Sequence, residues 1–364
     1  VTQKEVDKAI LSVPLELKTA ILQAKINIEL FHNSQKTEVK KIETMPGVTC
    51  WRQSKGIEKV GLYIPGGTAP LFSTVLMLAI PAQIAECKEI ILCTPPDKKG
   101  KINPAILFAA QLCGITKVYK VGGVQAIASM TFGTESIPKV FKIFGPGNQY
   151  VTMGKQMAQQ YGVAIDMPAG PSEVLVIADE TADPEFVAAD LLSQAEHGPD
   201  SQVILITTDE KLSKQVNKAI TSQLQLLPRK VVAERSLKNS KLVIINNIEE
   251  AIELSDLYAP EHLIIACKNA NEVAQQVATA GSVFIGNYSP ESAGDYASGT
   301  NHTLPTNGYA AMYSGVSLDS FVKKITYQEL TKEGLENIGQ TVMTMAAAEG
   351  LDAHKNAISI RLKK

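Results

Sequence analysis

Hydrophobic and polar positions along the chain follow two periods, one typical of helices and one typical of strands. Apolar residues recur at steps of three and four along residues 3–33, from Val6 to Ile21, which predicts an amphipathic helix. Further on, short runs rich in β-branched residues are each followed by a longer helical pattern. The strands predicted in the first half are Glu89–Cys93, Lys117–Val121, Val140–Phe144 and Gly162–Asp166, and the helices include Ser73–Cys87, Pro104–Cys113 and Tyr150–Tyr161.

The same alternation continues from Glu173 onward. Asp183 and Pro184 suit the N-cap and the first position of a helix, whose end carries Gln194 and His197 on one face. Because strand, turn and helix alternate in two blocks, we expect an α/β fold with two Rossmann-like, mostly parallel sheets. The strands predicted in this half are Glu173–Ala178, Ser201–Thr207, Leu242–Ile245, His262–Cys267 and Ser282–Ile285.

The alternation stops at Tyr309, and a small helical segment follows. Thr326 and Glu329 have the spacing of a capping box, which predicts the start of a helix. So short a segment cannot bury a core of its own, so we expect it to dock on another domain or another subunit. The expected domains are 1–62 together with 174–316, then 63–173, and the C-terminal segment 317–364.

The composition is that of an ordinary globular protein. Of 364 residues, 45% are hydrophobic and 20% are charged, and the formal net charge of −2 gives no reason to expect a nucleic-acid or membrane partner. The most apolar run, residues 75–80, is far too short to span a bilayer, and the first residues lack an apolar signal core. Five cysteines without C-x-x-C spacing favour a reducing, cytoplasmic location over a disulfide framework.

The segment from Tyr258 to His302 has the composition of a site rather than of a core. It opens with Glu261 and His262, a carboxylate beside an imidazole, which is the simplest acid/base pair that a protein can make. Asp295 and His302 follow in a stretch rich in Gly and Ser. A Glu-His dipeptide by itself is more often a solvated surface feature, so the rest of the chain has to decide between the two interpretations.

The histidines add to the case for a site. Each one taken alone is more often structural than metal-binding. Together with Gln194, Asp295 and Glu261, however, they supply the nitrogen and oxygen ligands that suit a divalent metal such as zinc with positions open for substrate. The four histidines in polar surroundings, out of five in the chain, are His197, His262, His302 and His354.

Eight collinear blocks, spread over nearly the whole chain, resemble the sequence of a known family, the histidinol dehydrogenases. Blocks of this length and number make the resemblance specific. Members of this family begin several dozen residues before the position of Val1. The blocks are Tyr63-Ile-Pro-Gly-Gly, Gly122-Gly-Val-Gln-Ala-Ile-Ala, Gly145-Pro-Gly-Asn148, Ala169-Gly-Pro-Ser172-Glu, Gln194-Ala-Glu-His197, Ala259-Pro-Glu-His262, Gly294-Asp295-Tyr-Ala-Ser-Gly-Thr-Asn-His302 and Ala353-His354-Lys-Asn-Ala.

The resemblance implies an NAD-dependent oxidoreductase that converts L-histidinol to L-histidine through L-histidinal with two NAD, the last step of histidine biosynthesis. His262 would act as the general base in alcohol oxidation, and Glu261 would activate water for aldehyde oxidation. The enzyme would contain zinc, with manganese as the alternative. The metal ligands implied by the family motif are Gln194, His197, Asp295 and His354.

The resemblance also implies how substrate, cofactor and partner are bound. The family forms homodimers in which the C-terminal segment completes the partner's site. It binds NAD without the usual dinucleotide fingerprint, and here Gly145-Pro-Gly also lacks the last glycine of one. The implied contacts to NAD are Tyr63, Gln125 and Asn148, and those to L-histidinol are Ser172, Gln194, His197, His262, Asp295, His302, Glu349 and His354.

Two other hypotheses fit part of the pattern. A metal-dependent hydrolase could use Glu261 to activate a metal-bound water, and such an enzyme would need no NAD. An inactive relative could serve in binding or regulation, and it would be expected to have lost Glu261, His262, Asp295 or His354. All four of these residues are present.

Overall fold

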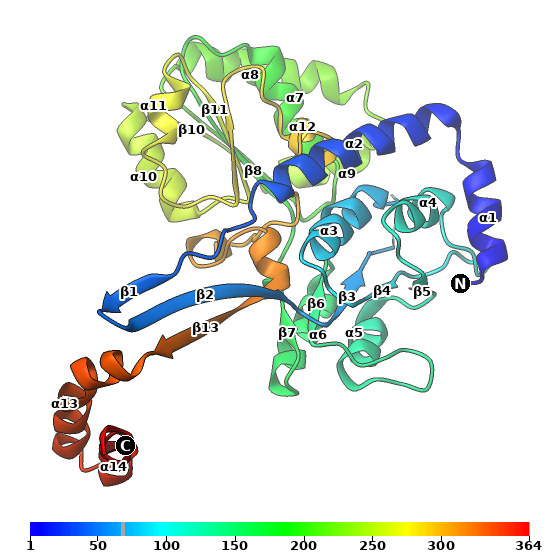
Figure 1. Ribbon diagram of the computed structural model, residues 1–364. Coiled ribbons are helices and arrows are strands. Elements are labelled where there is room, and N and C mark those ends of the chain that lie inside the picture. Colours follow the sequence, from blue (N-terminus) through cyan, green and yellow to red (C-terminus); the bar gives the residue numbers. More distant parts are fainter. Residues whose placement is uncertain (67–69, 364) are drawn as a thin grey trace. The chain divides into compact units, whose positions relative to one another are not determined.

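The computed structural model describes residues 1–66 and 70–363 (Figure 1). Gly67, which belongs to the first sequence block, and part of the loop predicted around it lie outside the described residues. By its internal contacts the chain divides into two units. Unit 1 comprises residues 1–35 and 57–321, and unit 2 comprises residues 36–56 and 322–364.

The first sheet of unit 1 is parallel and has the strand order β5-β4-β3-β6-β7. Since β4 and β5 lie on one side of β3 while β6 and β7 lie on the other, the strand order reverses between β3 and β6. Open α/β sheets bind ligands at such a point, beyond the carboxyl ends of the strands. The elements are β3 (Lys59–Tyr63), α3 (Phe72–Ile84), β4 (Glu89–Cys93), α4 (Pro104–Leu112), β5 (Lys117–Tyr119), α5 (Gly123–Phe132), β6 (Lys142–Phe144), α6 (Gln149–Gln160) and β7 (Ala164–Ile165).

The second sheet of unit 1 is also parallel and has the order β10-β9-β8-β11-β12, which reverses between β8 and β11. Every residue of β8 is buried, as expected of a central strand covered on both faces. The elements are β8 (Glu173–Ala178), α7 (Pro184–Ala195), β9 (Gln202–Thr207), α8 (Glu210–Leu224), α9 (Lys230–Leu237), β10 (Lys241–Ile244), α10 (Ile248–Tyr258), β11 (His262–Ala266), α11 (Ala270–Ala274), β12 (Ser282–Ile285), α12 (Glu291–Tyr296) and the 3₁₀ turns Tyr309–Ala311 and Leu318–Phe321.

Two apolar clusters cover the faces of the second sheet. Val174 and Val176 point from β8 into a cluster with α7, α8 and α9, whereas Leu175 and Ile177 point into a cluster with α10 and α11. These helices are labelled around the second sheet in Figure 1. This alternation follows from the two-residue period of a strand. The helix α7 begins as predicted, because Asp183 accepts a hydrogen bond from the Glu185 amide and Pro184 occupies the first position.

The two parallel sheets confirm the expected α/β fold, and two details of unit 1 differ from expectation. The single helix predicted over residues 3–33 is two helices, α1 (Gln3–Ser12) and α2 (Leu15–Asn33). Pro14 separates them because it lacks an amide hydrogen and does not fit inside a helix. Residues 59–62, which were expected to belong with 174–316, form most of the central strand of the first sheet through pairing with β4 and β6.

Unit 2 joins two distant parts of the chain in one antiparallel sheet, in the order β1-β2-β13. The long strands β2 and β13 run side by side, with Val322 opposite Gly56 and Leu330 opposite Val48 (Figure 1). The rings of Trp51 and Tyr327 stack across this pair, with centroids 5.4 Å apart. The elements are β1 (Ile42–Met45), β2 (Val48–Gly56), β13 (Val322–Leu330), α13 (Lys332–Ala348) and α14 (Asp352–Leu362).

The capping box predicted in this unit is wrong. Thr326 and Glu329 lie in β13, and the helix α13 begins after Thr331, whose side-chain oxygen accepts a hydrogen bond from the Gly334 amide. The C-terminal segment is therefore not wholly helical, and residues 36–56 pair with it rather than with 174–316. The strand was missed because its partner lies at the other end of the chain.

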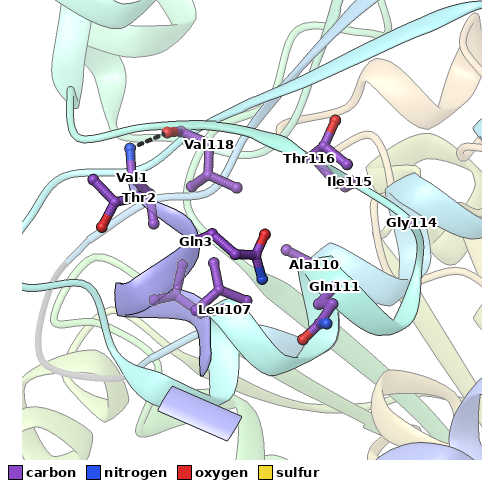
Figure 2. Close-up of a pocket in the computed structure, with 11 residues that line it drawn as sticks. Val1, Thr2, Gln3, Leu107, Ala110, Gln111, Gly114, Ile115, Thr116 and Val118 are labelled. Atoms are coloured by element: carbon purple, nitrogen blue, oxygen red, sulfur yellow. Dashed lines mark hydrogen bonds between the residues drawn. The ribbon is translucent and has the colours of Figure 1, made fainter. Parts of the chain in front are cut away.

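A cavity of about 140 Å³ lies where α1 meets α4 and β5, beside the hydrogen bond from the Val1 amine to the Val118 carbonyl (Figure 2). None of the predicted site residues lines it.

Along residues 1–66 and 70–363, no helix combines the length and the apolar character needed to cross a membrane.

In unit 2, Gly334 of α13 packs closely against Gly47. Replacing Gly334 by alanine should therefore lower the stability of the protein, whereas Gly→Ala in a helix usually raises it. In an exposed helix, Gly→Ala stabilises by about 1 kcal/mol. At Gly334 an added Cβ would lie 2.0 Å from the Gly47 carbonyl oxygen, which is backbone and cannot move aside cheaply. We therefore expect Gly334→Ala to destabilise unit 2 by about 1–3 kcal/mol.

The matched control is Gly339→Ala on the same helix, where the added Cβ would meet the flexible end of Leu362 at 2.9 Å. Thermal unfolding should show a lower midpoint for Gly334→Ala and a midpoint near or above the parent for Gly339→Ala. A midpoint for Gly334→Ala at or above that of the parent would contradict the described contact.

Candidate active site

A tight turn in the backbone places Glu261 and His262. The helix α10 ends at Tyr258, and Ala259 takes the left-handed conformation at φ 53°, which residues other than glycine rarely adopt. Pro260 follows, and β11 then begins at His262. The turn therefore delivers the carboxylate and the imidazole together to the start of a buried strand.

The backbone of Glu173, the first residue of β8, holds both side chains. Its amide donates to Glu261 Oε2 at 2.8 Å, and its carbonyl oxygen lies 2.9 Å from His262 Nδ1. Since a carbonyl oxygen can only accept, Nδ1 carries a proton. The other ring nitrogen, Nε2, faces Asp295 Oδ1 at 3.5 Å. Parallel pairing of β8 with β11 thus fixes both the position and the tautomer of the imidazole.

This group lies at the end of the second sheet opposite to the one where open α/β sheets usually bind ligands. Glu173 and His262 are the first residues of their strands, so they mark the amino edge of the sheet rather than its carboxyl edge. The remaining polar side chains come from the end of α7 and from α12, which contact each other. Two helices and two strand starts therefore build one site.

Potential metal ligands converge beside His262. The side-chain ligand atoms of His197, Glu291 and Asp295 all lie within 4.8 Å of one another. Gln194 is fully buried beside them, and with its amide oriented by its neighbours it donates to Glu291 Oε1 at 2.7 Å and accepts from the Glu173 amide at 3.0 Å. Three of the four residues expected to bind metal are therefore brought together in unit 1.

The donor set fits a divalent metal. Among the described residues, four buried atoms of this group have no hydrogen-bond partner, and orphaned polar atoms of this kind are costly in a protein interior. Imidazole and carboxylate ligands are those that zinc takes in catalytic sites. The four atoms are His262 Nε2, Asp295 Oδ1, Glu291 Oε2 and Glu173 Oε2.

The ionisation of these side chains follows from their burial and from the charges beside them. Burial lowers the pKa of His262, but the charge of Glu261 and the contact with Asp295 raise it more strongly, to about 10. Burial raises the pKa of Glu291 to about 8. Burial also acts to raise the pKa of Asp295, but the contact with His262 and the charges of the nearby imidazoles hold it below its ordinary value. Asp295 is thus the carboxylate that stays ionised, as a metal ligand must.

His302 and Ser172 border the same group. His302 Nδ1 lies 2.7 Å from the Asp295 carbonyl oxygen, and its Nε2 lies 3.0 Å from Thr74 Oγ1 on α3. His302 thus connects the loop of Asp295 to the helix that follows β3. Ser172 directly precedes Glu173 at the start of β8. Both positions suit the predicted contacts to substrate, which stay predictions.

The residues predicted to contact NAD lie at the carboxyl edge of the first sheet. Tyr63 ends β3, and its hydroxyl accepts a hydrogen bond of 3.1 Å from the Gly123 amide, at the start of the helix that carries Gln125. Asn148 follows β6 and caps α6 by accepting from the Tyr150 and Val151 amides. Strands β3 and β6 are the pair at which the strand order reverses, so this edge is where a ligand is expected.

Glu349 and His354 belong to unit 2. Glu349 is the C-cap of α13, and His354 lies in the first turn of α14. Both are exposed, and α14 has no buried residue. Their predicted contacts to substrate and metal therefore stay predictions.

Sequence reasoning missed two members of the group, Glu291 and Glu173. Glu291 lies four residues before Asp295 in a helix that begins after Pro290, so the two carboxylates share one face. This spacing is visible in the sequence and could have been used. Glu173 acts mainly through its backbone, and no sequence pattern signals that role.

Because the ligand atoms of His197, Glu291 and Asp295 converge, the affinity for zinc should depend on these side chains. We expect Asp295→Asn to weaken zinc binding by about tenfold or more, because it removes the ionised ligand of the group. Competition with a chromophoric chelator measures the dissociation constant. Asp209→Asn is the matched control, since it removes one carboxylate at the N-cap of α8, where Asn serves equally well. Equal zinc affinity in both variants would contradict the site.

Comparison with known proteins places the chain in a family. Residues 1–362 match the family model described as histidinol dehydrogenase. The histidinol dehydrogenase of Bacteroides fragilis (strain YCH46) is 66% identical over 364 residues, which cover 100% of this chain and 85% of that protein. The histidinol dehydrogenase of Vibrio vulnificus (strain YJ016) is 55% identical over 366 residues, covering 100% and 84%.

A solved structure agrees with this assignment. The crystal structure of histidinol dehydrogenase from Elizabethkingia anophelis superposes with a TM-score of 0.98 at 63% sequence identity, covering 100% of this chain and 84% of that one. Sequence and fold therefore agree over the whole described chain, as the eight sequence blocks predicted. The chain belongs to the histidinol dehydrogenase family.

Proposed function

We propose that the protein oxidises L-histidinol to L-histidine through L-histidinal with two NAD, the last step of histidine biosynthesis. Its family makes it an NAD-dependent oxidoreductase of that pathway. The observation that carries the proposal is the placement of Glu261 and His262 by the Glu173 backbone, with Asp295 facing the free imidazole nitrogen. An alcohol and an aldehyde step need a base and a water-activating carboxylate at one carbon, and the pair supplies both.

Zinc, or manganese in its place, would be held by Gln194, His197 and Asp295, together with the partner subunit's His354. A metal bound there would hold the imidazole and amino nitrogens of the substrate and so orient its alcohol carbon. The orphaned carboxylate and imidazole atoms around Asp295 support this assignment. Glu291 would orient Gln194 through their 2.7 Å hydrogen bond.

In the first oxidation, His262 would act as the base. Its Nδ1 proton is committed to the Glu173 carbonyl, so Nε2 is the nitrogen that would accept the hydroxyl proton of the substrate. Despite burial, the carboxylates beside it raise the pKa of His262 to about 10, and a cation held by Asp295 would offset their negative charge and lower that pKa, which would free Nε2 to act as a base. As the hydroxyl proton leaves, a hydride passes from the alcohol carbon to NAD, which gives L-histidinal and NADH. The fixed tautomer means that no rearrangement of the imidazole is needed before proton transfer.

In the second oxidation, Glu261 would activate water. Its carboxylate is held by the Glu173 amide next to His262, so it can take a proton from a water that attacks the aldehyde carbon. The resulting hydrate would lose a hydride to a second NAD and its hydroxyl protons to solvent, which yields the carboxylate of L-histidine. The two bases are neighbours in the chain and would serve the same carbon atom in turn.

Cofactor and partner complete the proposal. NAD would bind at the carboxyl edge of the first sheet, where Tyr63, Gln125 and Asn148 lie, so residues 63–173 would form the cofactor side and the second sheet the metal side. The enzyme would be a cytoplasmic homodimer in which residues 317–364 bring Glu349 and His354 to the partner's site. The family assignment leaves the hydrolase without support of its own, and the presence of Glu261, His262, Asp295 and His354 argues against the inactive relative.

The number of NADH formed per L-histidinol consumed tests the proposed function. We expect about two with zinc-loaded protein, because four electrons leave the substrate, and a loss of turnover after chelation that added zinc reverses. Absorbance at the NADH band with quantification of L-histidine provides the ratio. Absence of both NADH and L-histidine with the zinc-loaded protein would contradict the proposal, and a stable ratio of one would exclude the second step.

The two bases predict opposite effects on the two steps. His262→Asn should slow L-histidinol oxidation by about 10²–10⁴-fold while affecting L-histidinal oxidation less, because His262 is the proposed base for the alcohol proton whereas the attack of water on the aldehyde relies on Glu261. Glu261→Gln should do the reverse. Initial rates with each substrate, at saturating NAD, separate the steps. Equal losses in both steps for both variants would rule out this division of roles.

A further inference from the structure

A buried ion pair lies beside the first sheet, apart from the proposed catalytic residues in sequence. Lys155 Nζ and Asp166 Oδ1 are 2.5 Å apart, and their side chains are 3% and 1% exposed. Such a pair is weak support for stability, because removing two charges from water offsets much of their attraction. A role for this pair is therefore better sought in the groups that it holds in place than in stability.

Both side chains bind the backbone of one glycine. Lys155 Nζ donates to the Gly145 carbonyl oxygen at 2.8 Å, and Asp166 Oδ2 accepts from the Gly145 amide at 2.7 Å. Asp166 Oδ1 also accepts from the Met167 amide at 2.7 Å. Lys155 comes from the middle of α6 and Asp166 directly follows β7, so two elements fix the backbone at the end of a third, β6.

Gly145 opens the turn that leads from β6 to Asn148. Its φ of +126° is a conformation for glycine, and a Cβ there would meet the Tyr63 carbonyl oxygen at 2.0 Å. The turn thus rests on the last residue of β3. At its other end, Asn148 accepts from the first amides of α6. The ion pair determines where the turn begins, and Asn148 determines where the helix begins.

We propose that Lys155 and Asp166 are positioning residues for NAD, which hold the turn 145–148 in its cofactor-binding conformation. This inference rests on the proposed function, in which Tyr63 and Asn148 contact NAD. Without the pair, the amide and carbonyl of Gly145 lose charged partners and the turn can move away from Tyr63. The loss therefore falls on cofactor affinity and leaves L-histidinol binding, which depends on the second sheet, in place.

The decisive variant removes both charges together. Lys155→Met alone would leave Asp166 buried without its cation, and such a protein can fail to fold. Lys155→Met combined with Asp166→Leu replaces the pair by apolar side chains, which keeps the packing but removes both hydrogen bonds to Gly145. Lys155→Arg is the conservative variant, since it keeps the charge and the donor. Thr131→Val is the matched control, because it removes one buried hydrogen bond in α5 without touching the turn.

Calorimetric titration of the metal-loaded protein with NAD, and separately with L-histidinol, measures the two affinities, and thermal unfolding reports the fold. The double variant should bind NAD about tenfold or more weakly, as expected when hydrogen bonds to charged groups are lost, and bind L-histidinol within about twofold of the parent. Lys155→Arg should recover most of the NAD affinity, and Thr131→Val should bind NAD like the parent even where its unfolding midpoint falls.

Two results would overturn the inference. One is parent-like NAD affinity in the folded double variant, which would make the pair purely structural. The other is an equal loss of NAD and L-histidinol binding, which would mean a general disturbance of the fold. Failure of the proposed function shows elsewhere, in the parent protein, as an absence of NAD binding and of NADH formation.

Discussion

The parallel pairing of β8 with β11 is the constraint on which the rest of the site depends. Through it, one backbone unit, that of Glu173, holds a carboxylate with its amide and an imidazole with its carbonyl. Backbone groups cannot rotate away as side chains can, so the two candidate bases keep their positions whatever their own ionisation. The candidate metal ligands His197, Glu291 and Asp295 then approach this pair from α12 and from the end of α7.

The two sheets of unit 1 present their chemistry at opposite kinds of edge. The first uses the carboxyl edge, where glycine turns such as the one at Gly145 let helix N-termini approach a ligand. The second uses the amino edge, where the residues entering β8 and β11 are already buried and polar. In the proposed function, the cofactor side and the catalytic side rich in carboxylates therefore lie on separate sheets of one unit.

Much of the fold and part of the candidate site could be predicted from the sequence, because they depend on residues that are close together in the chain. The strands of both sheets follow apolar runs between turn residues, and Asp183 with Pro184 begins α7 as expected. Gln194 and His197 could be placed on one face by spacing alone. The strand β13 could not be predicted, because its pairing with β2 depends on residues at the other end of the chain. Nor could the role of Glu173, since backbone hydrogen bonds leave no signature in residue identity.

The sheet of unit 2 has a consequence for how the chain folds. Strand β2 is made before residues 57–321, yet its long partner β13 is made after them, so the chain must keep β2 available until almost all of unit 1 has been made. Contacts of such high sequence separation form slowly. A newly made chain would therefore carry β2 with one edge unpaired until β13 is made, and this is the stage at which aggregation threatens it most.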